Sequence, residues 1–323
     1  MTIAAQYREV PRSAVDLEDH PFSFAPPADL ERLLASIAEV GLLAPPWLRP
    51  KVGEKFQVIA GRRRCLAVTQ LGWERLPARV LPADTADSFC LLVSLYDNAF
   101  TRGFNPLEQA RLAGRLLSYW DRSAVTRKFL PLLAQPPAPG FLDRLLAVLA
   151  LEEPLQVLVA EGRLALSAAS RLAEWDPKDR LAVAPFLENL PLSQSKQEEL
   201  LEGVGLLARR EGTDPEAILG RPELRGLLGE PGKTPQERAG AMRRQLHRWL
   251  FPQLSRAEAD FAQALSRLGL SGHPRLSLKP PPAFEGPDFE LGVKFRNGAE
   301  LQNLLEEIAR LTAQEEFSAL TRL

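Results

Sequence analysis

The sequence predicts a mostly helical α+β protein, in which a small α/β domain precedes an all-α domain with a helix-turn-helix and a small α+β domain. Two observations predict this class: strand-like apolar runs occur near both ends of the chain, and helix-start signatures fill the region between them. A length of 323 residues, with 45% hydrophobic and 25% charged residues, suits two or three globular domains. The predicted domains span residues 1–104, 105–210 and 211–323.

The N-terminal domain is predicted to alternate short strands with amphipathic helices. Residues 28–41 place apolar side chains at helical spacing, and Gly41 offers the left-handed conformation that ends many helices. The expected elements that follow are a strand at PPWLRP, a strand at KFQVIA, a helix from GRRR to Gly72, a strand at LPARVL and a helix from about Asp84 to Tyr96. This order predicts a compact α/β unit whose middle helix follows directly from a strand.

The central region carries helix-start signatures. Asn105-Pro106-Leu107-Glu108 combines an N-cap residue, a proline at the first helical position and a glutamate at the third, and residues 234–237 repeat the pattern. Asp176-Pro177 and Asp214-Pro215 carry the cap and the proline, and Ser255-Arg256-Ala257-Glu258 is predicted as a capping box without proline. Residues 105 to about 268 are therefore predicted to be mostly helical.

The C-terminal tail changes character again. RLSLKPPPAFEGPDFELGVKF contains two alternating, strand-like segments around a proline-rich connection, and AELQNLLEEIARL is an amphipathic helix pattern. Dimerisation is one role open to this domain. No apolar run approaches the roughly 20 residues needed to span a bilayer, so we expect a cytoplasmic protein without membrane association.

Three arginines follow the glycine of the segment FQVIAGRRRCLAVTQLG: Arg62, Arg63 and Arg64. A helix N-terminus already carries partial positive charge, so each arginine there costs about 0.3–1 kcal/mol unless an anion compensates. Free amides, the close approach allowed by Gly61 and forked guanidinium groups together suit a phosphate. The alternative is that the arginines face solvent and pair with Glu54, Glu74 or Asp84.

Three segments in this order, ASIAEVGLLAPPWLRP, FQVIAGRRRCLAV and SLYDNAFTRGFNPLEQA, resemble the N-terminal domain of ParB-type chromosome-partition proteins. The family pattern has S-I-x-x-x-G-L at the end of a helix, a G-E-R-R helix start, and E-N-x-x-R ahead of an N-P-x-E helix. The segment LLAVLALEEPLQVLVAEGRLALSAASRLAEW is similar to the helix-turn-helix domain of the family.

The resemblance implies that the first domain binds a cytidine nucleotide, CTP, together with Mg²⁺, and closes the protein as a clamp on DNA. It implies that Gly61, Arg63 and Arg64 hold the phosphates and that Asp97 and Asn98 lie near the metal. Carboxylate and amide oxygens suit magnesium. The alternative for Asp97 and Asn98 is a plain helix C-terminus.

The sequence departs from the family pattern at functional positions. Arg62 replaces a glutamate, Asp97 replaces a glutamate with a side chain shorter by one methylene, and Thr101 stands at the position of an arginine. Phosphate binding is compatible with these changes, with Arg62 substituting for the metal. We therefore expect at most weak nucleotide hydrolysis and assign no catalytic residue.

DNA contacts are predicted in two basic regions, because a net charge of −1 leaves only local patches for nucleic acid. The candidate helix-turn-helix spans residues 123–150, but its helix PGFLDRLLAVL has few polar side chains and equally suits a buried helix of a bundle. Residues 238–256 are predicted as one amphipathic helix with a cationic face, which either contacts phosphates or is solvated and paired with acids. The candidate contacts are Arg122, Arg127, Lys128 and Arg144 in the first region and Arg243, Arg244 and Arg248 in the second.

Three hypotheses follow from the sequence. The leading one is a nucleotide-responsive, DNA-associated, homodimeric ParB-like protein of the cytoplasm and nucleoid, acting in chromosome or plasmid partition. The second is a phosphotransferase or nuclease that uses the same cleft, with Asp97 or Glu108 as general base. The third is an interaction adaptor that kept the fold and lost the ligand. Cys65 is expected to be a buried structural thiol.

Overall fold

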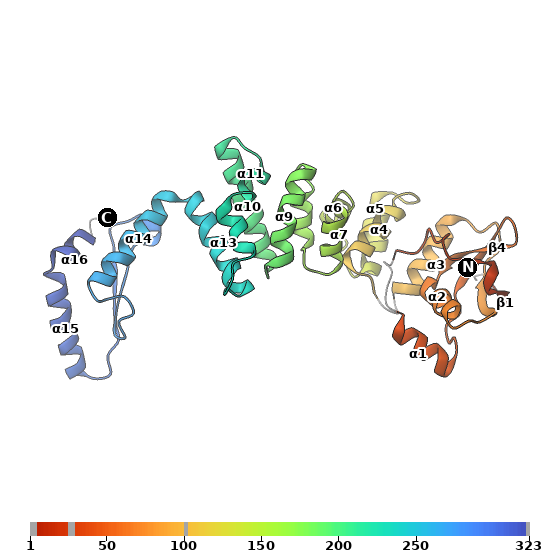
Figure 1. Ribbon diagram of the computed structural model, residues 1–323, viewed down its shortest axis with the longest axis horizontal. Helices are drawn as coiled ribbons and strands as arrows, with labels where there is room; N and C mark the ends of the chain where they lie inside the picture. The colour runs from red at the N-terminus through yellow and green to blue at the C-terminus, as the bar shows by residue number, and fades with distance from the viewer. Residues whose placement is uncertain (1–4, 25–29, 100–102, 321–323) are drawn as a thin grey trace. The chain divides into compact units, whose positions relative to one another are not determined.

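The computed structural model of the chain describes residues 5–24, 30–99 and 103–320 (Figure 1). The chain divides into two compact units, Met1–Glu188 with Leu192–Glu198, and Asn189–Pro191 with Glu199–Leu323. The mostly helical α+β class predicted from the sequence is confirmed, with strands only near the two ends of the described chain. The finer division into three domains stays a prediction.

The N-terminal part of the first unit is built on a five-stranded mixed sheet in the order β1-β5-β3-β4-β2. Its strands are β1 (Gln6–Pro11), β2 (Val15–Asp16), β3 (Trp47–Lys51), β4 (Lys55–Ala60) and β5 (Arg75–Val80). β5 pairs antiparallel with β1 and parallel with β3, while β4 pairs antiparallel with β3 and parallel with β2. The three expected strands are confirmed, and β1 and β2 are additions that the sequence did not predict.

The pairing of β3 with β4 contains an irregularity close to the start of the arginine-headed helix. Trp47 pairs with Ala60 and Leu48 pairs with Val58, so Ile59 has no opposite residue in β3. One unopposed residue in an antiparallel pair is a β-bulge, which bends the strand and increases its local twist.

Three helices accompany this sheet: α1 (Glu31–Val40), α2 (Arg62–Gln70) and α3 (Asp87–Ala99). Figure 1 shows them grouped with β1 and β4. One core joins α1 and α2 to the strands through buried apolar side chains, among them Ile37, Val68, Leu48 and Val58. α3 packs against β4. The core thus fixes the first turn of α2 at the end of β4.

The middle of the chain is helical, as expected. Its elements are α4 (Pro106–Leu116), α5 (Arg122–Ala124), a π-helical turn η2 (Val125–Phe129), a 3₁₀ turn η3 (Leu130–Leu133), α6 (Pro139–Val148), α7 (Glu153–Ala160), α8 (Leu166–Leu172), α9 (Pro177–Asn189) and α10 (Gln194–Glu211). α4 begins with the predicted capping box, in which the Asn105 side chain and the Glu108 carboxylate satisfy each other's backbone N–H groups.

The second unit continues with α11 (Pro215–Leu219), α12 (Pro222–Leu228), α13 (Pro235–Leu250) and α14 (Pro252–Arg267). The capping box at Thr234 is confirmed, whereas the one predicted at Ser255 is wrong because α14 already begins at Pro252. The single helix predicted over residues 238–256 is also wrong. Proline lacks the N–H that a continuous helix requires, and Phe251 leaves the helical region with φ −125° and ψ 65°.

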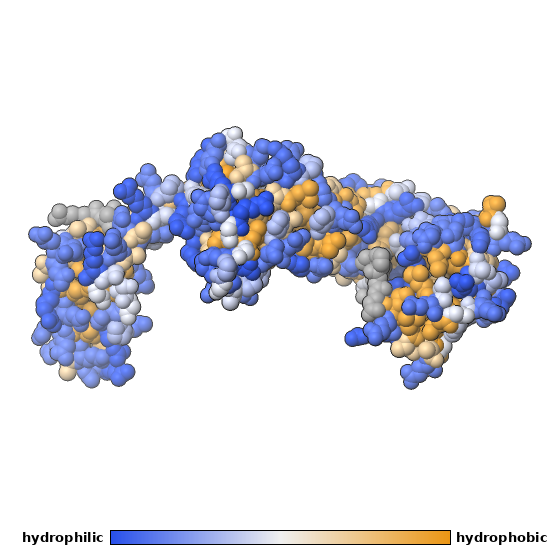
Figure 2. Space-filling view, in the orientation of Figure 1, coloured by the Kyte–Doolittle hydropathy of each residue, from blue (hydrophilic) through white to orange (hydrophobic). Residues whose placement is uncertain are grey.

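The tail contains the predicted hairpin and final helix. β6 (Leu276–Lys279) pairs antiparallel with β7 (Glu290–Val293), and α15 (Gly298–Thr312) and α16 (Glu315–Leu320) follow. A separate apolar core joins these elements to Phe261 of α14. Figure 2 shows that the visible face of this part of the chain is largely hydrophilic. No helix among the described residues is long and apolar enough to cross a membrane.

Candidate phosphate site at the start of α2

The candidate site lies where β4 passes into α2 through Gly61. Gly61 is the N-cap residue and has φ 89° and ψ 27°, a left-handed conformation that favours glycine. A Cβ atom at this position would lie 2.9 Å from Nε of Arg64 and 3.0 Å from Cβ of Pro46. The glycine is therefore required both by the backbone turn and by the side chain that folds back over it.

The three arginines of the first turn take different directions. Nε of Arg62 donates to the carbonyl oxygen of Leu17 at 3.1 Å. Arg63 is exposed at the surface. Arg64 turns back over Gly61, and its guanidinium donates to the carbonyl oxygen of Ala44 at 2.7 Å. The arginines therefore do not form one cluster around an anion in this structure.

Arg64 also reaches across to α3, where its Nη2 lies 2.5 Å from Oδ2 of Asp97. Both side chains are only 19% exposed. The other carboxylate oxygen of Asp97 accepts a hydrogen bond from the indole Nε1 of Trp47 at 3.2 Å. The carboxylate partner of Arg64 is therefore Asp97, and not Glu54, Glu74 or Asp84. This ion pair offsets the cost of placing Arg64 at a helix N-terminus.

The structure thus brings together residues from two predicted site segments. Gly61 and Arg64 of the GRRR segment meet Asp97 of the DNAFTR segment, and Asn98 follows at the end of α3, where its Nδ2 donates to the carbonyl oxygen of Ser94 at 2.8 Å. Thr101, which departs from the family pattern, lies outside the described residues.

The residues at this site fit a phosphate better than a metal ion. The first N–H groups of a helix lack intrahelical partners, and α2 has no acidic residue in its first turn. The Asp97 carboxylate, in contrast, already accepts from a guanidinium and an indole. Among the described residues there is no group of three or more His, Cys, Asp or Glu side chains that could hold a metal. Magnesium coordination by Asp97 and Asn98 stays a prediction.

Trp47 is a site residue that the sequence reasoning missed. It lies 50 positions from Asp97, so no local pattern links the two. Its ring also faces the Arg79 guanidinium at 5.1 Å, and Arg79 lies 5.8 Å from the ring of Tyr7, which is 65% exposed. Arg79 is the direct neighbour of both residues in the sheet, so β1, β5 and β3 carry one row of stacked side chains.

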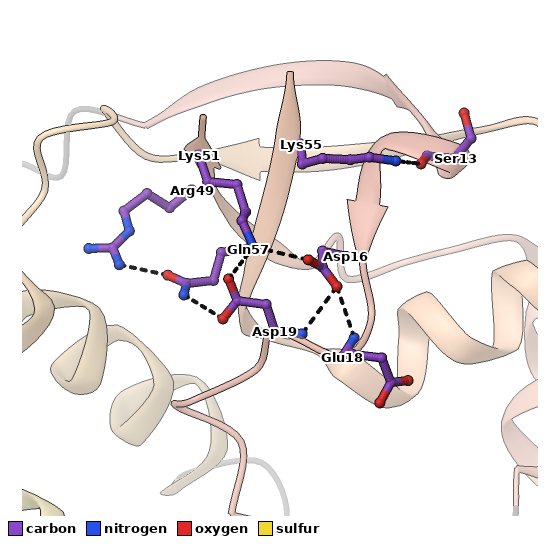
Figure 3. A network of polar contacts seen from close by, with 8 residues as sticks. All are labelled: Ser13, Asp16, Glu18, Asp19, Arg49, Lys51, Lys55 and Gln57. Carbon is purple, nitrogen blue, oxygen red and sulfur yellow. Dashed lines mark hydrogen bonds and ion pairs between the residues drawn. The ribbon is translucent and has the colours of Figure 1, made fainter. Parts of the chain in front are cut away.

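A second polar cluster of this domain, on β3, β4 and the segment after β2, is fully paired (Figure 3). Nζ of Lys51 lies 3.0 Å from Asp16 and 2.7 Å from Asp19, and Gln57 donates to Asp19 at 2.8 Å. The hydrogen bond from Lys51 lowers the pKa of Asp16. Burial acts to raise the pKa of Asp19, but the hydrogen bonds from Lys51 and Gln57 outweigh it and lower that pKa. These charges tie the strands together and leave the α2 region as the better anion site.

The first predicted DNA-contacting region is partly neutralised. Arg122 forms an ion pair with Asp143 of α6, the helix proposed to read DNA. Arg144 stacks over the Phe141 ring at 5.3 Å and Lys128 over the Phe129 ring at the same distance, while Arg127 is exposed. α6 buries Leu142, Leu145 and Val148 and packs against α4 and α8. The alternative of a helix packed in a bundle is therefore correct for its apolar face.

In the second basic region, one of the three candidate arginines forms an ion pair and the other two are exposed. Arg243 forms an ion pair with Glu199 at 2.7 Å. Arg244 and Arg248 are exposed on α13, and no hydrogen bond or ion pair of their side chains is found within the described part of the chain. Exposed, unpaired arginines one helical turn apart remain available to phosphates.

Known partition proteins are similar to parts of this chain. The family described as the ParB N-terminal domain matches residues 5–99. A probable plasmid-partitioning protein ParB of Thermus thermophilus is 39% identical over 90 residues, which are 28% of this chain and 29% of that protein. A probable chromosome-partitioning protein ParB of Coxiella burnetii is 27% identical over 205 residues, which are 62% of this chain and 68% of that protein. The chain thus spans less than a third of the first relative's length.

Among solved structures, a C-terminally truncated ParB of Caulobacter crescentus in complex with CTP-γ-S is similar over 57% of this chain and 99% of that chain, with 22% identity and a TM-score of 0.26. This degree of similarity assigns no ligand to the present chain. Residues 5–99 of the chain thus match the ParB N-terminal domain family, and two partition proteins are similar to parts of the chain.

Proposed function

We propose that this chain is a DNA-associated ParB-type protein whose N-terminal domain responds to a nucleoside triphosphate, CTP in the first instance. Its role would be the partition of chromosomes or plasmids, or a related organisation of DNA, as a homodimer associated with the nucleoid. The observation that carries the proposal is an arginine-headed helix, with Gly61 at its start, inside a domain of the ParB N-terminal family.

Gly61 and the three arginines would bind the nucleotide phosphates, Gly61 by allowing close approach and the arginines by charge-assisted hydrogen bonds. Asp97 and Asn98 would lie beside the phosphates, where their oxygens would hold Mg²⁺ and the ion would offset part of the phosphate charge. The exposed Arg63 is the arginine of this turn nearest to solvent, and Arg62 would replace the glutamate of the family pattern with a further cation.

We do not favour an enzymatic use of the same site. Of the two candidate bases, Glu108 is 1% exposed, and its carboxylate accepts the Asn105 N–H at 2.9 Å as part of the α4 cap. Asp97 is paired with Arg64. A general base must reach the proton that it abstracts. We therefore propose a binding switch with at most weak hydrolysis.

A ligand-free adaptor is the second candidate, and two observations favour it. Arg64 is already satisfied by protein acceptors, and Arg122 is neutralised by Asp143. An adaptor would keep the fold because these pairs stabilise it without any nucleotide.

Calorimetric titration with CTP, ATP and GTP, with and without Mg²⁺, tests the proposal. We expect CTP to bind and Arg63→Gln to weaken binding about tenfold or more, since a hydrogen bond to a charged group contributes about 1.5–3 kcal/mol. The matched control is Arg8→Gln, which removes the same charge from an exposed position of β1. No heat with any nucleotide would favour the adaptor.

A further inference from the structure

The Arg64 guanidinium already donates to protein oxygens, where a phosphate would otherwise be expected. Its Nη1 donates to the carbonyl oxygens of Ala44 at 2.7 Å and Pro45 at 3.4 Å, and its Nη2 lies 2.5 Å from Asp97. Its Nε lies against Gly61. The guanidinium therefore occupies the space between the first turn of α2 and the end of α3, with its donors directed at protein oxygens.

Asp97 is positioned for this contact by Trp47. The indole Nε1 of Trp47 donates to Oδ1 of Asp97, while Oδ2 faces Arg64, so both carboxylate oxygens have a donor. Trp47 is only 9% exposed, and Arg79 stacks on its ring. A buried indole N–H normally has a partner, and here that partner fixes the carboxylate on the guanidinium.

We propose that Asp97 is an internal anion that competes with the ligand phosphate for Arg64, with Trp47 as the residue that positions it. This inference rests on the proposed function, because it concerns the same anion site at the start of α2. In the ligand-free protein the Asp97 carboxylate takes the place of a phosphate oxygen. Binding then exchanges one ion pair of Arg64 for another, rather than adding a new one.

The exchange has a consequence for selectivity. A phosphate group gains from Arg64 only the difference between its own interaction and that of the carboxylate it replaces. A ligand with one or two charges gains little from this exchange, while a polyphosphate also contacts the helix amides and Arg63 and displaces Asp97 with net gain. The pair thus favours triphosphates over monophosphates without any contact to the base.

Competition for Arg64 and metal coordination by Asp97 predict different effects on anion binding when the charge of Asp97 is removed. If Asp97 only served as a magnesium ligand, removing its charge would weaken nucleotide binding in the presence of Mg²⁺ and leave metal-free binding unchanged. If Asp97 competes for Arg64, removing its charge strengthens anion binding without any metal. Asn retains the shape and one acceptor oxygen for Trp47, while an uncharged NH2 group replaces the oxygen that faces Arg64.

The test is calorimetric titration of the full chain with inorganic pyrophosphate and with CTP, both without divalent cations. We expect Asp97→Asn to bind each about tenfold more tightly than the unmodified chain, equivalent to about 1.4 kcal/mol. The matched control is Asp87→Asn, which removes a carboxylate from the other end of α3 whose partner is Arg49 at 2.8 Å. We expect the control to bind as the unmodified chain does, which separates direct competition from a change in net charge.

Equal or weaker metal-free binding by Asp97→Asn overturns the inference. If the unmodified chain nevertheless binds CTP, the proposed function stands. If neither protein binds any nucleotide, the proposed function fails and the inference with it.

A second variant decides the matter if Asp97→Asn does not fold. Trp47→Phe keeps a ring for Arg79 and removes only the N–H that holds Asp97. We expect its metal-free affinity for pyrophosphate to rise about threefold, by loss of one hydrogen bond to the competing carboxylate. An unchanged affinity contradicts the competition.

Discussion

At the scale of single residues, the start of α2 shows how burial and charge decide which side chains remain chemically available. Arg63 is exposed, while the next residue but one, Cys65, is 2% exposed in the core that joins α1 and α2 to the sheet. Burial raises the pKa of the Cys65 thiol to about 12, although the neighbouring Arg64 acts to lower it. The same cause raises the pKa of Cys90 to about 11. The Cys65 thiol in this turn is therefore expected to be unreactive, and only the arginines of the turn are suited to binding a ligand.

The first prediction concerns Cys65. Since the thiolate is the reactive form, we expect almost no alkylation of Cys65 by iodoacetamide at pH 8 in the native protein. The same reaction in denaturant should be complete, because unfolding restores the ordinary pKa of the thiol. Peptide mass spectrometry after timed labelling measures both rates. Native labelling of Cys65 as fast as in denaturant would show that this helix is not packed as described.

At the scale of elements, the sequence predicted what local chemistry determines. The N-cap, proline and glutamate at residues 105–108 and 234–237 predicted capping boxes that the structure confirms. β1 was not predicted because only Val10 of its six residues is buried, so its sequence lacks the apolar alternation of a half-buried strand. The Ser255 pattern failed because Pro252 starts α14 first. The Trp47–Asp97–Arg64 contacts could not be predicted, since they join residues that are far apart in sequence.

The second prediction compares the two basic elements. Arg244→Gln with Arg248→Gln removes two exposed charges of α13 and should reduce the slope of log K against log salt by about two for duplex DNA. Arg127→Gln with Lys128→Gln is the matched pair in η2. DNA retention measured at several salt concentrations gives each slope. If neither pair changes the slope, these elements make no phosphate contacts.

At the scale of the whole molecule, two compact units contain separate apolar cores. One core lies in the N-terminal sheet domain, and another joins α14 to the C-terminal hairpin and helices. Each unit contains one of the confirmed capping boxes, at Asn105 in the first and at Thr234 in the second. Units with their own cores can unfold separately, and a chain of this kind departs from two-state behaviour.

The third prediction follows from this division. Asn105→Ala should lower the free energy of unfolding of the first unit by about 1 kcal/mol and its melting temperature by about 2–4 °C. Thr234→Ala should do the same to the second unit alone. Differential scanning calorimetry of both variants resolves which transition moves. If both variants shifted one shared transition equally, the chain would unfold as a single cooperative body.

The unopposed Ile59 of β4 has a consequence for how this domain tolerates changes in chain length. It lies two positions before Gly61, so it determines which side of the sheet the chain faces as it leaves the strand. Deleting one residue there would restore regular alternation and rotate the departing backbone, carrying the arginine-bearing turn away from α3. The hairpin between β3 and β4, at Val52 and Gly53, does not set the direction in which the chain leaves β4. Natural variation in length should therefore collect in that hairpin and avoid the end of β4.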